Sequence, residues 1–282
     1  MKIALRVVAG AALLALVIWY VDPRSLARSL AGVDPWLFAA AVGVAILSNV
    51  ASALRWGAIA HRLGLASSTR NTLLMYARAI TANMMLPGSL VSGDVLRSFQ
   101  LSRLGNPLPM SAWSVFLDRF SGLWILCAMS ALAALALGYW GYAAILAAAF
   151  VLPLVPVPLP GAGRARELAS NLRNARPILL GSAWYSGVVQ LLAAGTLWVC
   201  AQSIGLGVSY ALMLAAAAPI FIMAALPIGV AGFGAREAAA VAVLGMAGVP
   251  GEQAFLVGLL YGLAAVVQGI LAAPLFLAKA SL

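Results

Sequence analysis

The chain has 282 residues, of which 64% are hydrophobic and 9% charged, and its mean hydropathy is +1.04. This much apolar surface exceeds what a soluble core of the same size can bury, so the composition excludes a soluble globular protein and predicts a polytopic membrane protein. The net charge of +10 comes from 17 basic residues against seven acidic ones. The basic residues cluster in short loops between apolar runs, as the positive-inside rule predicts, and we therefore expect no nucleic-acid partner.

The apolar runs predict an all-α fold. With about 20 residues per spanning helix, the length allows roughly eight crossings. The first run, 3–21, has a basic start and no small-residue cleavage site directly after it, so we expect an uncleaved helix. The other predicted helices are 35–55, 111–137, 142–159, 179–204, 209–226, 236–247 and 253–278. The run 236–247 is too short to cross alone; it is either completed by 227–235 or half of a helical hairpin. We expect one domain, 1–282.

Residues 72–101 carry charges and a break at Pro87-Gly88, and we expect a re-entrant hairpin there. A helix break at membrane depth persists only where protein or a water-filled cavity meets the freed backbone groups. The helix that restarts after the break directs unpaired N–H groups and the positive end of its dipole into the membrane, which favours an anion such as a phosphate headgroup. Asn83 and Tyr76 share a face of the first arm, where Asn83 either faces a ligand or satisfies the broken backbone.

Placing the N-terminus in the cytoplasm puts most loop arginines on the cytoplasmic side. Both termini are therefore expected to be cytoplasmic, with the hairpin entering from that side. A second Gly- and Pro-rich break begins at Pro227 and echoes the one at Pro87. Paired broken elements are typical of transporter folds, but this topology puts both breaks on the same side, which does not suit an inverted repeat.

Ionisable residues within membrane segments are rare and usually line a pathway. Asp94 and Arg97 are three residues apart and share a helix face, so they either form a functional pair or Asp94 caps the second hairpin arm. Asp118 belongs to a polar stripe at helical spacing on the third crossing, and it is a candidate partner of Arg97 or of Arg119. Arg55 ends the second crossing, where it either binds a ligand or extends to the interface.

Residues 227–237 form a Gly-rich stretch that ends in Arg236-Glu237. No Lys follows it as a nucleotide-binding loop requires, so it is either part of the site or a flexible cytoplasmic turn with solvated charges. The chain has one His, two Cys in apolar runs and no acidic cluster. We therefore expect no metal, no cofactor and no enzymatic activity.

Four motifs occur in order along the chain. They are Asn49…Arg55-Trp56, Asn83…Leu86-Pro87-Gly88…Gly93-Asp94…Arg97, Asp118-Arg119…Gly122-Leu123, and Pro227…Gly232-x-Gly234-x-Arg236-Glu237. Together, on an eight-crossing plan, they resemble the flippase-like membrane region of lysylphosphatidylglycerol synthases over nearly the whole chain. The multiple peptide resistance factor adds a cytoplasmic aminoacyl-transferase domain to this region, whereas we expect a stand-alone member here.

The resemblance implies a multi-pass protein of the bacterial inner membrane that moves a lipid between leaflets. The partners it implies are a phospholipid or other anionic lipid, the membrane, and a separate lipid-synthesising enzyme. The residues that match the motifs, together with Gly88 of the helix break, make up the expected substrate site: Arg55, Asn83, Gly88, Asp94, Arg97, Asp118, Arg119, Arg236 and Glu237.

Three other functions remain open at this point. A membrane-embedded enzyme acting on lipid-linked substrates would use a carboxylate such as Asp94 as a base. A secondary transporter of a small solute would need a closed midplane cavity with ligands for a coupling ion. A membrane scaffold for a partner synthase would give the buried charges only a structural role.

Overall fold

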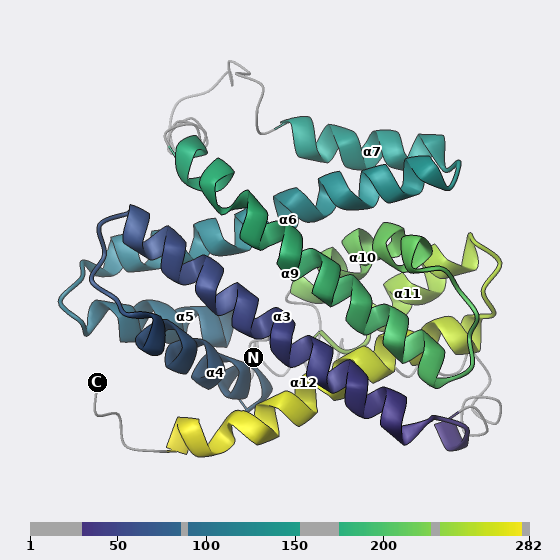
Figure 1. The fold of residues 1–282 in the computed structure, drawn as a ribbon, viewed down its shortest axis with the longest axis horizontal. Coiled ribbons are helices and arrows are strands. Elements are labelled where there is room, and N and C mark those ends of the chain that lie inside the picture. The colour runs from purple at the N-terminus through teal and green to yellow at the C-terminus, as the bar shows by residue number, and fades with distance from the viewer. Residues whose placement is uncertain (1–29, 86–89, 153–174, 227–231, 278–282) are drawn as a thin grey trace, which may run out of the picture.

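A computed structural model of the chain describes residues 30–85, 90–152, 175–226 and 232–277, and within them the regular elements are all α-helices (Figure 1). The predicted first crossing, 3–21, lies outside the described residues, as do Pro87, Gly88 and Pro227. Among the helices in these ranges, four are long and apolar enough to cross a membrane: α3 (Pro35–Arg62), α6 (Leu108–Ala136), α9 (Arg176–Ser203) and α12 (Gly251–Leu277). Each has at least 27 residues, a length of about 40 Å against a hydrocarbon core of about 30 Å.

The boundaries of α3 follow from its sequence. Asp34 caps the helix by accepting hydrogen bonds from the backbone N–H groups of Trp36 (2.8 Å) and Leu37 (3.1 Å), and a proline follows at the first helical position. The helix continues past the predicted end at Arg55 to Arg62, because Arg55 lies inside the bundle rather than at its surface.

The predicted hairpin within 72–101 is confirmed as a pair of packed helices, α4 (Thr69–Met85) and α5 (Leu90–Ser102). The side-chain oxygen of Asn83 accepts a hydrogen bond from the Gly93 backbone N–H (2.7 Å) and so joins the two arms. A Cβ at Gly93 would lie 2.6 Å from the Ala79 carbonyl oxygen, so only glycine allows the arms to approach this closely. With 17 and 13 residues, the arms are about 26 and 20 Å long, too short for two crossings.

A second hairpin consists of α10 (Tyr210–Ala225) and α11 (Ala235–Gly245), which pack against each other. The hairpin alternative for the run 236–247 is thus the one that the structure adopts. The remaining helix, α7 (Trp140–Val151), packs against α6, and Trp124 of α6 donates a hydrogen bond to the Phe150 carbonyl (2.8 Å). It starts near the predicted 142–159, whose last residues lie outside the described ranges.

The antiparallel helices α3 and α9 define the two ends of the bundle (Figure 1). At one end, called the Arg62 end, the Arg62 guanidinium donates a hydrogen bond to the Ile178 carbonyl (3.4 Å). At the other, called the Ser203 end, the Asp34 backbone N–H donates to the Ser203 carbonyl (2.7 Å).

The two hairpins enter the bundle from opposite ends. The loops that flank α4 and α5 meet at the Arg62 end, where Asn106 accepts a hydrogen bond from the Ala66 backbone (2.7 Å). The segments that flank α10 and α11 meet at the Ser203 end, where Ile204 packs against Phe255 at the start of α12. The described helices thus differ from the expected topology, which put both breaks on the same side by counting the run 209–226 as a full crossing: α10 has only 16 residues and packs against α11. The breaks themselves lie outside the described residues.

Candidate functional site

A cavity of about 290 Å³ lies inside the bundle, bordered by residues of all four long helices and of both hairpins. Its polar side chains include Arg55, Asn83, Arg97, Arg119 and Arg236. Residues predicted for the site from four separate motifs thus border one cavity. Tyr76 lines it beside Asn83, as their shared helix face predicts. Apolar side chains complete the lining, among them Leu126, Phe221 and Val266.

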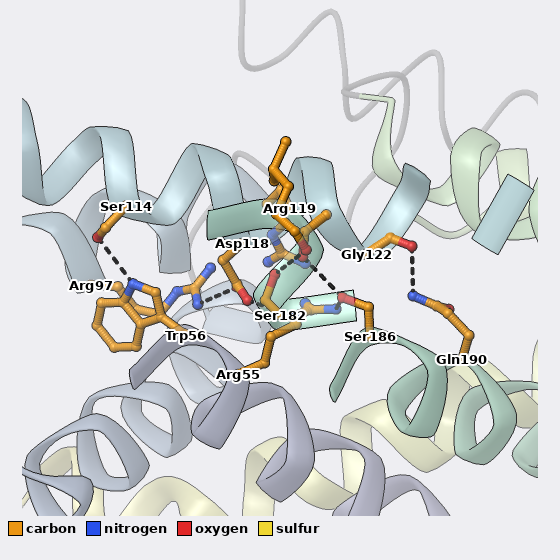
Figure 2. Close-up of polar contacts among 12 residues, drawn as sticks. Arg55, Trp56, Arg97, Ser114, Asp118, Arg119, Gly122, Ser182, Ser186 and Gln190 are labelled. Carbon is orange, nitrogen blue, oxygen red and sulfur yellow. Dashed lines mark hydrogen bonds and ion pairs between the residues drawn. The ribbon is translucent and has the colours of Figure 1, made fainter. Parts of the chain in front are cut away.

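Asp118 bridges two arginines at the centre of the site (Figure 2). One carboxylate oxygen accepts from Nε of Arg55 (2.8 Å), and the other accepts from Nη1 of Arg97 (3.0 Å). The Asp118 side chain has 0% exposure, and Arg55 is 4% exposed. Arg55 therefore does not extend to the interface, and of the two partners expected for Asp118 only Arg97 is bound to it.

Asp94 takes the other expected partner, Arg119. The carboxylate accepts hydrogen bonds from Nε and Nη2 of Arg119 (3.0 and 2.9 Å) and from Nη2 of Arg97 (2.7 Å). Asp94 lies beyond the first turn of α5 and forms the predicted pair with Arg97. Its side chain is 23% exposed and that of Arg119 is 36% exposed, so this is the accessible part of the site.

These contacts form an alternating series, which we call the arginine–aspartate chain: Arg55, Asp118, Arg97, Asp94 and Arg119, in that order. It joins three helices, because α3 supplies the first arginine, α5 supplies Asp94 and Arg97, and α6 supplies Asp118 and Arg119. Buried charges are tolerated when each is paired and hydrogen-bonded, and every member of this series has at least one partner of opposite charge.

Arg97 is held by aromatic rings as well as by carboxylates. Its guanidinium lies 4.9 Å from the ring centre of Trp56 and 4.7 Å from that of Tyr76, and cation–π attraction is strongest where water is excluded. The Trp56 indole N–H donates a hydrogen bond to Ser114 (3.1 Å). The sequence reasoning missed this role of Trp56, although an aromatic residue next to a membrane arginine was a usable signal.

The polar stripe of α6 is buried against neighbouring helices: Ser114 and Asp118 contact α3, and Ser121 contacts α9. Ser121 and Ser186 share a hydrogen bond (2.9 Å), and Ser186 also accepts from Nη1 of Arg55 (3.4 Å). The Gln190 side chain donates to the Gly122 carbonyl (2.9 Å). A Cβ at Gly122 would lie 2.8 Å from Nη1 of Arg55, so the glycine makes room for the guanidinium.

Arg236 and Glu237 form a buried pair at the start of α11 rather than a solvated turn. Nη2 of Arg236 lies 2.7 Å from the Glu237 carboxylate, which has 0% exposure, and Nε donates to the Gly258 carbonyl (2.9 Å). Glu237 also accepts a hydrogen bond from the Gly234 backbone N–H (2.5 Å) at the N-terminus of its own helix, where a negative charge is favourable. A Cβ at Gly262 would collide with the Arg236 guanidinium, so this small residue makes the position possible.

A further buried arginine was not predicted. Arg78 of α4 donates a hydrogen bond to the Leu275 carbonyl in the last turn of α12 (2.9 Å) and fixes the first hairpin to that helix. A charge in the middle of a hairpin arm was the available signal. Within the described ranges, no three His, Cys, Asp or Glu side chains gather as a metal ion would require.

The comparisons with known proteins agree with the motifs. Residues 3–273 match the family model described as the lysylphosphatidylglycerol synthase TM region, which spans the expected site from Arg55 to Glu237. A search of curated proteins finds no match. The four helices of the described part of the chain that are able to span a membrane fit such a region. The chain is therefore a multi-pass membrane protein that belongs to the lysylphosphatidylglycerol synthase TM region family.

Proposed function

We propose that this protein is a lipid translocase, or lipid-binding transporter, of the bacterial inner membrane with both termini in the cytoplasm. It holds an anionic headgroup in the central cavity while the acyl chains stay in lipid, and it leaves the lipid covalently unchanged. The observation that carries the proposal is the arginine–aspartate chain at the border of a cavity of about 290 Å³. Membership of a membrane family linked to lipid handling supports it.

Arginine is suited to this task, because its planar guanidinium binds phosphate oxygens in pairs and is less strongly hydrated than an ammonium group. An unpaired charge in the middle of a bilayer costs about 3 kcal/mol on insertion scales. Asp94 and Asp118 keep the arginines paired while the cavity is empty of lipid. On binding, the phosphate replaces Asp94 at the accessible Arg119, and the return of Asp94 favours release.

The lining suits an amphiphile. Arg55, Arg97 and Arg119 lie on α3, α5 and α6, whereas Phe221 of α10 and Val266 of α12 contribute apolar surface to the same cavity. A headgroup and the first part of its acyl chains thus find matching surroundings in one space, which supports a lipid over a small polar solute.

The opposed hairpins provide a route for movement. Asn83, near the end of the first arm of the first hairpin, and Arg236, in the first turn of the second arm of the second hairpin, border one cavity although their hairpins enter from opposite ends. In transporters, substrate sites lie near the midplane between broken helices, and one element moves against another around the site. Displacement of either hairpin opens the headgroup site toward its own end of the bundle.

The test is reconstitution into liposomes that contain a fluorescent phospholipid, with its transfer between leaflets measured by quenching from outside. We expect transfer by the wild type, a loss of about tenfold or more in Asp94→Asn and Arg97→Gln, and no loss in Arg103→Gln, which removes an exposed arginine beyond the end of α5. Mass spectrometry of the recovered lipid should find it unchanged. Transfer equal to that of empty liposomes contradicts the proposal, and conversion of a lipid-linked substrate instead supports an enzyme.

A further inference from the structure

The charges around the cavity do not cancel. Its lining includes four arginines, namely Arg55, Arg97, Arg119 and Arg236. Three carboxylates contact them: Asp94, Asp118 and Glu237. Among the described residues that form this site, one positive charge therefore remains in excess.

The excess belongs to the arginine–aspartate chain. Arg236 is matched by Glu237, to which it is bound one to one. The arginine–aspartate chain begins and ends with an arginine, so three guanidinium groups share two carboxylates. Arg97, in the middle, has a carboxylate on each side, and its guanidinium lies 4.9 Å from the ring centre of Trp56 and 4.7 Å from that of Tyr76. The capacity to bind a further anion therefore lies with the two end arginines, Arg55 and Arg119.

Both end arginines retain donors for a ligand. Among the hydrogen bonds formed by the described residues, none uses Nη2 of Arg55 or Nη1 of Arg119. Both residues line the cavity. Each carboxylate of the series already faces arginine, because both oxygens of Asp118 accept from an arginine and Asp94 accepts from two arginines. The unused guanidinium donors therefore favour an anion at this site.

We propose that the headgroup bound by this site carries one net negative charge, as a phosphodiester does, and that Arg119 and Arg55 bind it. This inference rests on the proposed lipid-binding function and adds the charge class of the ligand. One negative charge neutralises the site, whereas a phosphomonoester, with a charge of about −1.5 to −2 at pH 7, leaves an uncompensated negative charge in a low-dielectric space. A zwitterionic headgroup carries no net charge, so the excess positive charge of the site stays uncompensated.

The test compares three probe lipids with the purified full-length protein in detergent: phosphatidylglycerol, phosphatidic acid and phosphatidylethanolamine. Competition against fluorescent phosphatidylglycerol gives the relative affinities. We expect the wild type to prefer phosphatidylglycerol by about tenfold over either competitor, the ratio that one charge-assisted hydrogen bond supports. Water-soluble glycerophosphoglycerol, which has the same headgroup without acyl chains, separates a lipid site from a site for a free phosphodiester. Weak competition by it supports the lipid, and equal competition overturns the lipid part of the inference.

Two variants move the site charge in opposite directions. Asp94→Asn replaces the carboxylate with an amide of nearly the same shape and raises the excess charge of the site to two positive charges. It should shift the lipid preference toward phosphatidic acid. Arg119→Gln removes the excess and should lower the affinity for phosphatidylglycerol about tenfold, and Arg119→Lys should restore part of it. Arg103→Gln removes an exposed arginine and should change no ratio.

The inference is overturned if both site variants shift the preference in the same direction, or if neither changes it while each retains wild-type thermal stability. Liposome transfer separates this failure from failure of the proposed function. Transfer without charge selectivity contradicts the charge class alone. Charge-selective binding without transfer contradicts translocation alone and supports the site.

Discussion

Replacing Asp118 with Asn tests whether the arginine–aspartate chain holds the bundle together. The amide keeps the shape of the carboxylate but removes the charge that faces Arg55 at 2.8 Å and Arg97 at 3.0 Å. Arg97 keeps Asp94, whereas Arg55 keeps only the 3.4 Å contact with Ser186. Leaving a charge unpaired in a buried site costs about 3–5 kcal/mol. For a chain of this size we expect the unfolding temperature to fall by roughly 10 °C.

Two native cysteines of the protein can report this unfolding. Cys127 and Cys200 are free and buried, so a thiol-reactive fluorogenic dye in detergent reports their exposure during heating. The matched control is Glu252→Gln, which removes a carboxylate from the first turn of α12 and should cost about 0.5 kcal/mol through the helix dipole. An Asp118→Asn protein as stable as this control would refute the reasoning.

A double variant separates lost charge from lost shape. If the cost comes from an unpaired cation, Arg55→Gln combined with Asp118→Asn should destabilise the protein by less than the sum of the single changes, with a coupling of about 1–3 kcal/mol. Additive effects would instead indicate that each side chain contributes only its own packing.

Two other predictions concern glycine and asparagine contacts. Gly262→Ala should displace the Arg236 guanidinium and reduce lipid transfer about tenfold, whereas Gly187→Ala, with open space around the new methyl group, should leave transfer unchanged; equal transfer in the two variants would argue against a role for Arg236. Asn83→Ala should remove the acceptor of the Gly93 N–H, weaken the first hairpin by about 1–3 kcal/mol and speed hydrogen exchange at Gly93. An unchanged exchange rate would show that this hydrogen bond does not hold the two arms together.

The helices and the first hairpin were predictable because their signals are local. A long apolar run has to form a helix to satisfy its backbone in lipid, and Pro87-Gly88 marks an interruption within such a segment. The polar stripe of α6 was also readable, because helical spacing alone puts Ser114, Asp118 and Ser121 on one face, and all three are buried.

The pairing of the charges was not predictable in full, because it depends on how the helices are rotated against one another. Asp118 had two plausible arginine partners in the sequence, and it binds one of them together with Arg55, which lies 63 residues away. The second hairpin remained one of two alternatives, because the apolar run 209–226 reads like a full crossing, whereas α10 has only 16 residues. The packing of α10 against α11 decides between them.

The spacing of Arg55 and Asp118 along the chain also has a consequence for biogenesis. At a synthesis rate of about 5–20 residues per second, α3 emerges several seconds before the carboxylate that neutralises its arginine. During this interval the cation has no such partner, and an unpaired arginine in the middle of a bilayer costs about 3 kcal/mol. The packing of α3 into the bundle is therefore complete only after α6 has been synthesised.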